Sequence, residues 1–121
     1  MKAGVSLGGC YSMGESWPNL SFLSRQAFHV RTGATSEEQA VENAGEFSLA
    51  SAPATKGIPF LVVHGERDRL FDTEQAKRMA QHFGSDAELI LEPDGNHVLH
   101  NLAYRVRPEA ADWLAVELVS S

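Results

Sequence analysis

The amino-acid sequence predicts an α/β protein: a parallel sheet of about three strands with flanking helices and a small helical cap segment. Short apolar runs at residues 3–7, 60–63 and 87–91 alternate with longer segments of helical periodicity. The run at residues 60–63 lacks polar alternation, as is typical of a central parallel strand buried on both faces. Strands that alternate with helices form parallel sheets with right-handed crossovers. With 121 residues, 43% of them apolar, we expect a single domain over residues 1–121.

The first half of the chain is expected to supply one strand and the cap. The strand at residues 3–7 ends at a Gly-Gly turn. Two helices should follow, one at residues 20–30, where apolar residues recur near the helical repeat, and one at residues 36–44. A Thr-Ser-Glu-Glu capping box predicts the start of the second helix, and Gly45 predicts its end. Both helices lie within residues 14–50, which we expect to form the cap or lid.

The second half continues the alternation after the strand at residues 60–63. Asp72 or Thr73 should cap a helix that ends at Gly84. The strand at residues 87–91 follows, and Pro108 is expected to open the last helix. The apolar residues expected to share one helix face are Ala76, Met79, Ala80 and Phe83 in the first helix, and Ala111, Leu114, Ala115 and Leu118 in the second.

Composition narrows the classes of partner. The formal net charge is -6, and the sequence has no long run of lysine or arginine that would indicate a binding surface for nucleic acid or for an anionic membrane. A small neutral or organic substrate suits this surface better. Cys10 is the single cysteine, so no internal disulfide can form and a reducing cytoplasm is the expected location. Neither a signal peptide nor a membrane-spanning segment is expected.

Two polar loops follow the predicted second and third strands directly. One contains His64 and Asp68, and the other is Asp-Gly-Asn-His, ending at His97. The carboxyl ends of parallel strands meet at one edge of a sheet, and neighbouring strands lie about 4.8 Å apart, so we expect Asp68 and His97 to meet at hydrogen-bond distance. A carboxylate on one ring nitrogen fixes the imidazole tautomer and stabilises the imidazolium that forms when the other nitrogen takes a proton. Asp68 and His97 thus have the residue types and the chain order of the acid and the histidine of a Ser-His-Asp triad.

These loops also resemble a known family. Residues 59–68, Pro-Phe-Leu-Val-Val-His-Gly-Glu-Arg-Asp, resemble the last-but-one strand and acid loop of α/β-hydrolases, and residues 92–97, Glu-Pro-Asp-Gly-Asn-His, resemble their histidine loop. With residues 100–102 and 111–114, the histidine loop is similar to that of dihydroxypseudooxynicotine hydrolase-like esterases, relatives of dienelactone hydrolases and prolyl oligopeptidase-type enzymes. The resemblance covers most of the chain and is strongest over residues 58–118. It implies carbonyl hydrolysis without a metal or other cofactor, and a helical cap over the site.

Ser6 lies in a Gly-x-Ser-x-Gly pattern at residues 4–8, which offers a candidate nucleophile. A nucleophile elbow needs a full strand before the serine and a helix directly after it, whereas only three residues precede Gly4, and Gly14 and Pro18 interrupt any helix behind it. The reading we favour makes residues 2–9 a later strand of the sheet that leads into the cap. The nucleophile would then lie upstream of Met1. A genuine elbow at Ser6 stays the alternative.

The other histidines are weaker candidates for the site. His100 is a rival base but is expected to be structural, and His64 is expected to pack at the strand end. A zinc site of His64, Asp68, His97 and His100 has suitable ligand chemistry but no compact ligand motif, so we expect no metal.

The remaining candidates have structural interpretations. Glu15 is either an accessory acid or, as we favour, a solvated loop residue. Trp17 and Trp113 are expected to pack in the core rather than to bind substrate. Arg105 and Arg107 are expected to form a solvated face.

Two functions of different classes follow. The first is a serine hydrolase of ester, amide or carbon–carbon bonds next to a carbonyl, present as a C-terminal fragment with Asp68 and His97, acting on a small-molecule carbonyl substrate and inactive alone. The second is a non-catalytic module that binds a partner or pairs with a separate N-terminal piece. A three-stranded remnant exposes a strand edge, so a homo-oligomer or a missing N-terminal half is the expected macromolecular partner.

Overall fold

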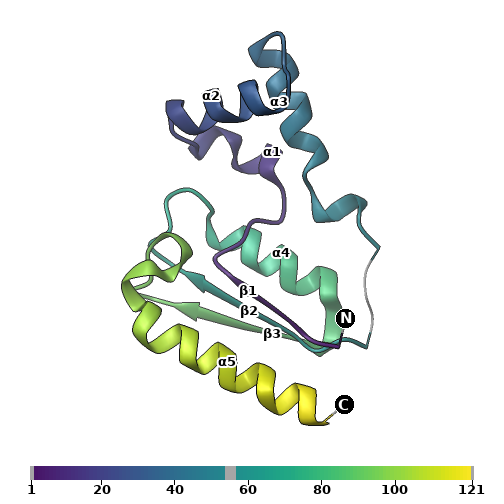
Figure 1. The fold of residues 1–121 in the computed structure, drawn as a ribbon, viewed down its shortest axis with the longest axis vertical. Coiled ribbons are helices and arrows are strands. Elements are labelled where there is room, and N and C mark those ends of the chain that lie inside the picture. Colours follow the sequence, from purple (N-terminus) through teal and green to yellow (C-terminus); the bar gives the residue numbers. More distant parts are fainter. Residues whose placement is uncertain (1, 54–56, 121) are drawn as a thin grey trace.

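The centre of the fold is a three-stranded parallel sheet. The computed structural model describes residues 2–53 and 57–120, and its strands are β1 (Gly4–Leu7), β2 (Phe60–Gly65) and β3 (Ala87–Glu92), in the order β1-β2-β3 (Figure 1). Both neighbouring pairs are parallel, with Ser6 beside Val62 and Val62 beside Leu89. Every residue of β2 is buried. The predicted fold class is confirmed, and the unbroken apolar run belongs to the central strand.

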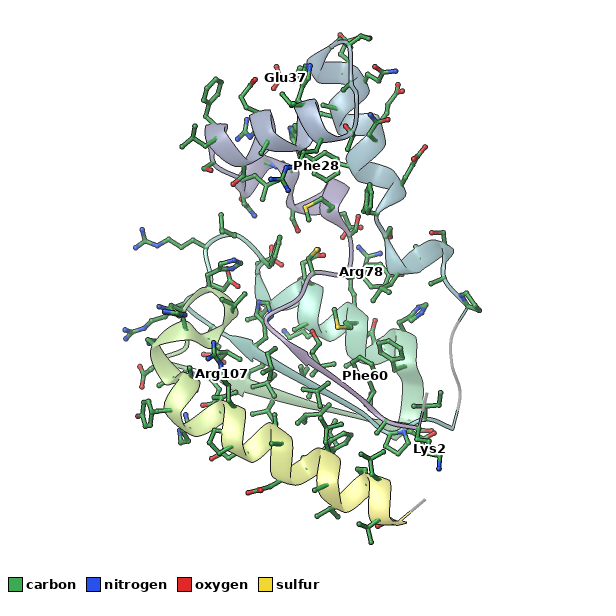
Figure 2. All side chains as sticks on the ribbon, viewed as in Figure 1. Lys2, Phe28, Glu37, Phe60, Arg78 and Arg107 are labelled. Carbon is green, nitrogen blue, oxygen red and sulfur yellow. The ribbon has the colours of Figure 1, made fainter. Side chains whose placement is uncertain are left out.

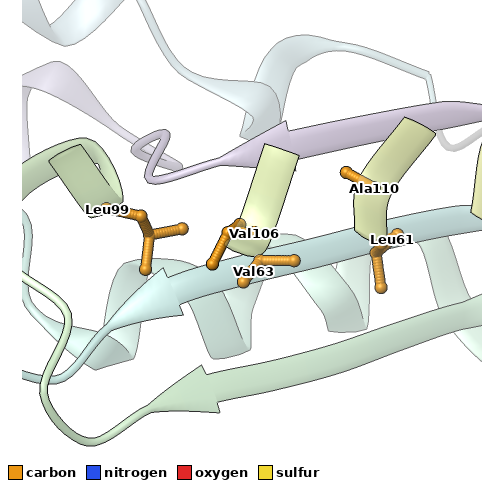
Figure 3. Close-up of a cluster of buried hydrophobic side chains, with 5 residues drawn as sticks. All are labelled: Leu61, Val63, Leu99, Val106 and Ala110. Carbon is orange, nitrogen blue, oxygen red and sulfur yellow. The ribbon is translucent and has the colours of Figure 1, made fainter. Parts of the chain in front are cut away.

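Two helices cover opposite faces of the sheet, because side chains alternate along β2. Phe60 and Val62 pack against Ala76 and Met79 of α4 (Thr73–Phe83). On the other face, the second core cluster joins β2 to α5 (Ala103–Ser120) and to the 3₁₀ segment η4 (His97–Leu102). Figure 3 shows its five buried members, Leu61, Val63, Leu99, Val106 and Ala110. These two clusters hold the carboxyl ends of the strands in fixed positions.

Helix α4 follows the sequence prediction closely. The Asp72 carboxylate accepts a hydrogen bond from the Gln75 N–H at 3.4 Å, which satisfies one free donor of the first turn. Gly84 ends the helix with φ +80°, a conformation that favours glycine.

Helix α5 differs from its prediction. It begins at Ala103, so Pro108 lies inside the helix. The hydrogen bond that Pro108 cannot donate would reach the carbonyl of Tyr104, and because Tyr104 is exposed, water can replace that bond at small cost. The buried residues are Val106 and Ala110 rather than the predicted set, of which Ala111, Ala115 and Leu118 are exposed. Packing against β2, not the apolar pattern alone, selects the buried face.

The helices α1 (Met13–Ser16), η1 (Trp17–Asn19), α2 (Phe22–Arg31) and α3 (Glu37–Glu46), which follow β1, form a separate cluster, and α1 to α3 gather away from the sheet in Figure 1. The short η2 (Leu49–Ser51) packs instead, through Leu49, on the core shared by β2 and α4. The core of the cluster contains Trp17, Leu20, Ala40 and Ala44, and the rings of Trp17 and Phe28 meet edge-on at 5.9 Å. Trp17 is thus a packing residue, as expected.

Helix α3 was expected to stop at Gly45 but continues through it. The backbones of α1 and α3 touch here, since a Cβ on Gly14 would lie 3.0 Å from the Gly45 Cα, and this contact keeps Gly45 within the helix. The predicted cap is also altered. Ser36 accepts from the Gln39 N–H, and the Gln39 amide, not a glutamate, reaches back to the Thr35 N–H at 2.6 Å.

Gln75 joins the helical cluster to α4. Its buried side-chain oxygen accepts hydrogen bonds from the Tyr11 and Ser12 N–H groups at 2.9 and 2.8 Å, and its amide nitrogen donates to Glu15 at 3.0 Å. Arg78 pairs with Glu15 and places its guanidinium 4.3 Å from the Tyr11 ring centre; Figure 2 shows Arg78 between the two parts. Glu15 is therefore neither a free accessory acid nor a merely solvated residue. Hydrogen bonds from Arg78 lower the pKa of its carboxyl.

Gln75→Ala is expected to lower the free energy of unfolding by about 2–3 kcal/mol, because it leaves two N–H groups without an acceptor at this junction. Gln81→Ala is the matched control, since Gln81 lies on the same helix but is exposed, and it should change stability by less than about 0.5 kcal/mol. Urea denaturation followed by circular dichroism measures both. Equal stability losses in the two variants would contradict the role given to Gln75.

Candidate active site

Asp68 lies in the loop that leaves the central strand, and its carboxylate is completely buried. One carboxylate oxygen, Oδ1, accepts hydrogen bonds from the N–H groups of Leu70 and Phe71 at 2.9 and 3.0 Å, which forms a tight turn over residues 68–71. The Asp68 N–H donates to the Gly65 carbonyl at 3.2 Å. The two bonds to Oδ1 stabilise the buried carboxylate and fix its direction.

His97 meets this carboxylate. Its ring nitrogen Nδ1 lies 3.2 Å from Asp68 Oδ1 and 3.1 Å from Oδ2, as the positions of the two residues after neighbouring strands predicted. The Phe71 ring packs edge-on against the imidazole, with ring centres 5.4 Å apart. The His97 side chain is 39% exposed, and Nε2 has no hydrogen-bond partner among residues 2–53 and 57–120. The arrangement leaves Nε2 of His97 accessible, while Nδ1 is fixed by the Asp68 carboxylate.

The acid loop and the histidine loop touch along their backbones. The Glu66 N–H donates to the Glu92 carbonyl, and the Arg67 N–H donates to the Gly95 carbonyl, both at 2.9 Å. No side chain fits between the two loops at Gly65, because a Cβ on Gly65 would lie 2.3 Å from the Gly95 carbonyl oxygen. Glycine at position 65 is therefore required by the close approach that brings the carboxylate to the imidazole.

The histidine loop is also closed on itself. Asn96 and Asn101 each accept, through the side-chain oxygen, the other's backbone N–H at 3.2 and 2.9 Å, and the Asn101 amide donates to the Asp94 carbonyl at 2.8 Å. Arg105 makes two hydrogen bonds to Glu92, at 2.8 and 3.1 Å, which lower the pKa of the Glu92 carboxyl. The expectation that Arg105 only contributes to a solvated face is thus wrong, because it anchors the end of β3 to α5.

The two residues after His97 have a strained backbone. Val98 and Leu99 have φ values of +52° and +58°, in the left-handed region that costs a non-glycine residue about 1–2 kcal/mol. Leu99 is buried in the core next to β2, which holds the turn in place. Gly8, after β1, lies against this turn, since a Cβ there would come within 2.6 Å of the Val98 Cα. All three strands therefore contribute to the position of His97.

Ser6 lies in the middle of β1, beside Val62. Its hydroxyl is next to Gly9, where a Cβ would lie 2.7 Å from Ser6 Oγ and 3.4 Å from the Met79 side chain, so Ser6 points to the sheet face covered by α4. The chain after β1 is irregular until the four-residue helix α1. A strand, a sharp turn and a helix do not follow one another at Ser6, and the hydroxyl makes no hydrogen bond to His97 in the described residues.

The other histidines have separate environments. His64 is fully buried, with Nε2 2.6 Å from the Phe71 carbonyl oxygen and 3.6 Å from Asp68 Oδ2. His100 is exposed. Within residues 2–53 and 57–120, no three His, Cys, Asp or Glu side chains are grouped to hold a metal ion. In the same residues, no helix has the length and apolar character needed to cross a membrane.

A cavity of about 400 Å³ lies apart from Asp68 and His97, where the chain enters and leaves the helical cluster. Cys10 contributes to it and is half-buried, and burial raises the pKa of its thiol, which fits an unreactive packing residue. The other residues that line the cavity are Tyr11, Met13, Glu46, Phe47, Ser48 and Leu49.

Sequence reasoning found Asp68 and His97 but missed the residues that orient them. Phe71 contributes both an N–H to Asp68 and a ring to His97. An aspartate that starts a four-residue turn is a known signal for such N–H contacts and could have indicated this part. The paired asparagines 96 and 101 carry no comparable signal, because their contacts depend on the folded loop.

No protein-family model matches the sequence, and no curated protein does. Among solved structures, the crystal structure of the 2,6-dihydroxy-pseudo-oxynicotine hydrolase matches with a TM-score of 0.85 and 25% sequence identity, over 98% of this chain. The match covers 34% of that protein, so the chain spans about a third of its length. The fold is thus that of part of an α/β-hydrolase, as the sequence resemblance indicated.

Gly65→Ala is expected to lower the free energy of unfolding by at least about 2 kcal/mol, because its Cβ would overlap the Gly95 carbonyl and separate the two loops. Gly45→Ala is the control: a Cβ there meets no atom within 4 Å, and alanine should stabilise the helix by about 0.5–1 kcal/mol. Chemical denaturation of both variants gives the comparison. A Gly65→Ala protein as stable as the Gly45→Ala protein would contradict the close contact.

Proposed function

We propose that residues 1–121 are the acid- and histidine-bearing part of a serine-type α/β-hydrolase that cleaves an ester, amide or carbon–carbon bond next to a carbonyl. The contact between the buried Asp68 carboxylate and His97 Nδ1 carries the proposal. Acids and imidazoles pair in many structural ion pairs, but here Nδ1 is held, Nε2 is accessible, and both residues leave the carboxyl ends of neighbouring parallel strands. This is the arrangement that general-base catalysis by a triad histidine needs.

In the proposed reaction, His97 is the catalytic residue and Asp68 its positioning residue. His97 Nε2 takes the proton of a serine hydroxyl as its oxygen attacks the substrate carbonyl carbon. The imidazolium that results is stabilised by the Asp68 carboxylate, which keeps its negative charge. The proton then passes from Nε2 to the leaving group, and the acyl-enzyme is hydrolysed by a water that His97 activates in the same way. The substrate is a small carbonyl compound.

The nucleophile in this proposal is a serine outside residues 1–121, not Ser6. The position of Ser6 in the middle of β1, on the α4 face, supports this choice. In the described residues no strand pairs with the outer edge of β1, and a parallel strand added there would end at the same edge of the sheet as Asp68 and His97. We therefore propose that the segment with the nucleophile pairs with β1.

The helices between β1 and β2 supply the proposed cap over residues 14–50. They form their own core, and Gln75 and Arg78 hold them against α4. Phe71 belongs to both parts, because it packs on this core and on the His97 ring. A substrate bound at His97 would thus lie next to the cap. Because the only cysteine is half-buried and unpaired, we propose the cytoplasm as the location.

A chimera tests the proposed function directly. Residues 2–120 would replace the matching third of the 2,6-dihydroxy-pseudo-oxynicotine hydrolase, and hydrolysis of its substrate would be measured. We expect activity that falls by at least about 10³-fold in both His97→Ala and Asp68→Asn chimeras, since both act on one proton transfer. His100→Ala is the control and should retain activity. A folded chimera whose activity is the same with and without His97 would contradict the proposal.

A second test concerns Ser6. The 121-residue chain should show negligible hydrolysis of an activated ester and no burst of product, and a fluorophosphonate should leave Ser6 unmodified by mass spectrometry, because the serine lacks a base and an elbow. Ser6→Ala should behave like the unaltered chain. A burst that the Ser6→Ala change abolishes would make Ser6 the nucleophile and overturn this part of the proposal.

A further inference from the structure

The last-but-one residue of β2, His64, is buried next to the candidate site without a role in the reaction described above. Its side chain has 0% exposure, and its Nε2 lies 2.6 Å from the Phe71 carbonyl oxygen. A carbonyl oxygen can only accept a hydrogen bond, so Nε2 must carry the proton. The other nitrogen, Nδ1, is buried and has no partner in the described residues. These contacts require an imidazole that is protonated at Nε2.

Phe71 links this histidine to the candidate site. Its N–H donates to Asp68 Oδ1, its carbonyl accepts from His64, and its ring packs on His97. The bond from His64 therefore holds the far end of the turn over residues 68–71 against the central strand. Without that bond, the turn could rotate its N–H groups away from the carboxylate, and the Asp68 oxygens would no longer face His97 Nδ1.

We propose that His64 is a positioning residue for the Asp68–His97 pair and acts through the Phe71 carbonyl. The inference rests on the proposed function for its catalytic meaning, but its physical content is a hydrogen bond that fixes a turn. The competing interpretation is that His64 only fills space at the end of β2. A positioning role requires a hydrogen-bond donor at position 64, whereas a space-filling role requires only a side chain of similar volume.

The test uses nitrogen-15 NMR of the imidazole rings in the 121-residue chain, well above the ordinary histidine pKa of about 6.5. In the unaltered chain, His64 should be protonated at Nε2, and the His97 Nδ1 proton should exchange slowly with water because Asp68 accepts it. His64→Leu keeps a similar volume but removes the donor. It should speed this exchange by about tenfold, because the turn loses the net contribution of one hydrogen bond. His64→Gln can donate from its amide to the Phe71 carbonyl and should restore slow exchange to within about threefold.

Each outcome decides the inference. A folded His64→Leu chain with unaltered exchange at His97 would overturn it, and so would a His64→Gln chain that behaves like His64→Leu. If neither variant folds, the unaltered chain still decides, because His64 protonated at Nδ1 alone would exclude the bond to Phe71. His100→Leu is the control and should change nothing. Fast exchange at His97 in the unaltered chain would instead contradict the Asp68–His97 pair, and with it the proposed function.

Discussion

The candidate site depends on the close approach of two glycines. Gly65 ends the central strand and Gly95 lies in the histidine loop, and no Cβ can be placed between them. Neighbouring strands of a parallel sheet lie about 4.8 Å apart. The contact between the two glycine backbones keeps the loops that follow β2 and β3 equally close, so the Asp68 carboxylate meets the His97 imidazole. The hydrogen bonds between the loops follow from the same contact.

Order at the site comes at the cost of local backbone strain. Val98 and Leu99 adopt left-handed conformations, and the buried Leu99 side chain supplies packing energy that offsets this strain. The strained turn lies directly after His97, so the core fixes the position of the imidazole. A loop without such an anchor would let the ring move relative to Asp68, whereas the proposed reaction needs a general base within hydrogen-bond reach of the proton that it takes.

Two parts of the molecule meet at α4 and Phe71. The sheet with α4 and α5 supplies the acid and the histidine, and the helical cluster is fastened to it by the hydrogen bonds of Gln75 and the ion pair of Arg78. Since Phe71 packs on both the helical cluster and His97, a shift of the cluster relative to the sheet would change the packing around the His97 imidazole. The outer edge of β1 has no strand beside it in the described part of the chain.

The sequence by itself determined the features that arise from local periodicity and capping: the three strands, the limits of α4 from Asp72 to Gly84, and the parallel order that puts Asp68 beside His97. The tertiary structure alone decided which face of α5 is buried, where that helix begins, and that Glu15 and Arg105 form ion pairs. It also decided the strain after His97 and the direction of the Ser6 hydroxyl. These features depend on contacts between residues far apart in the chain, and a local pattern contains no information about which distant surface a side chain will meet.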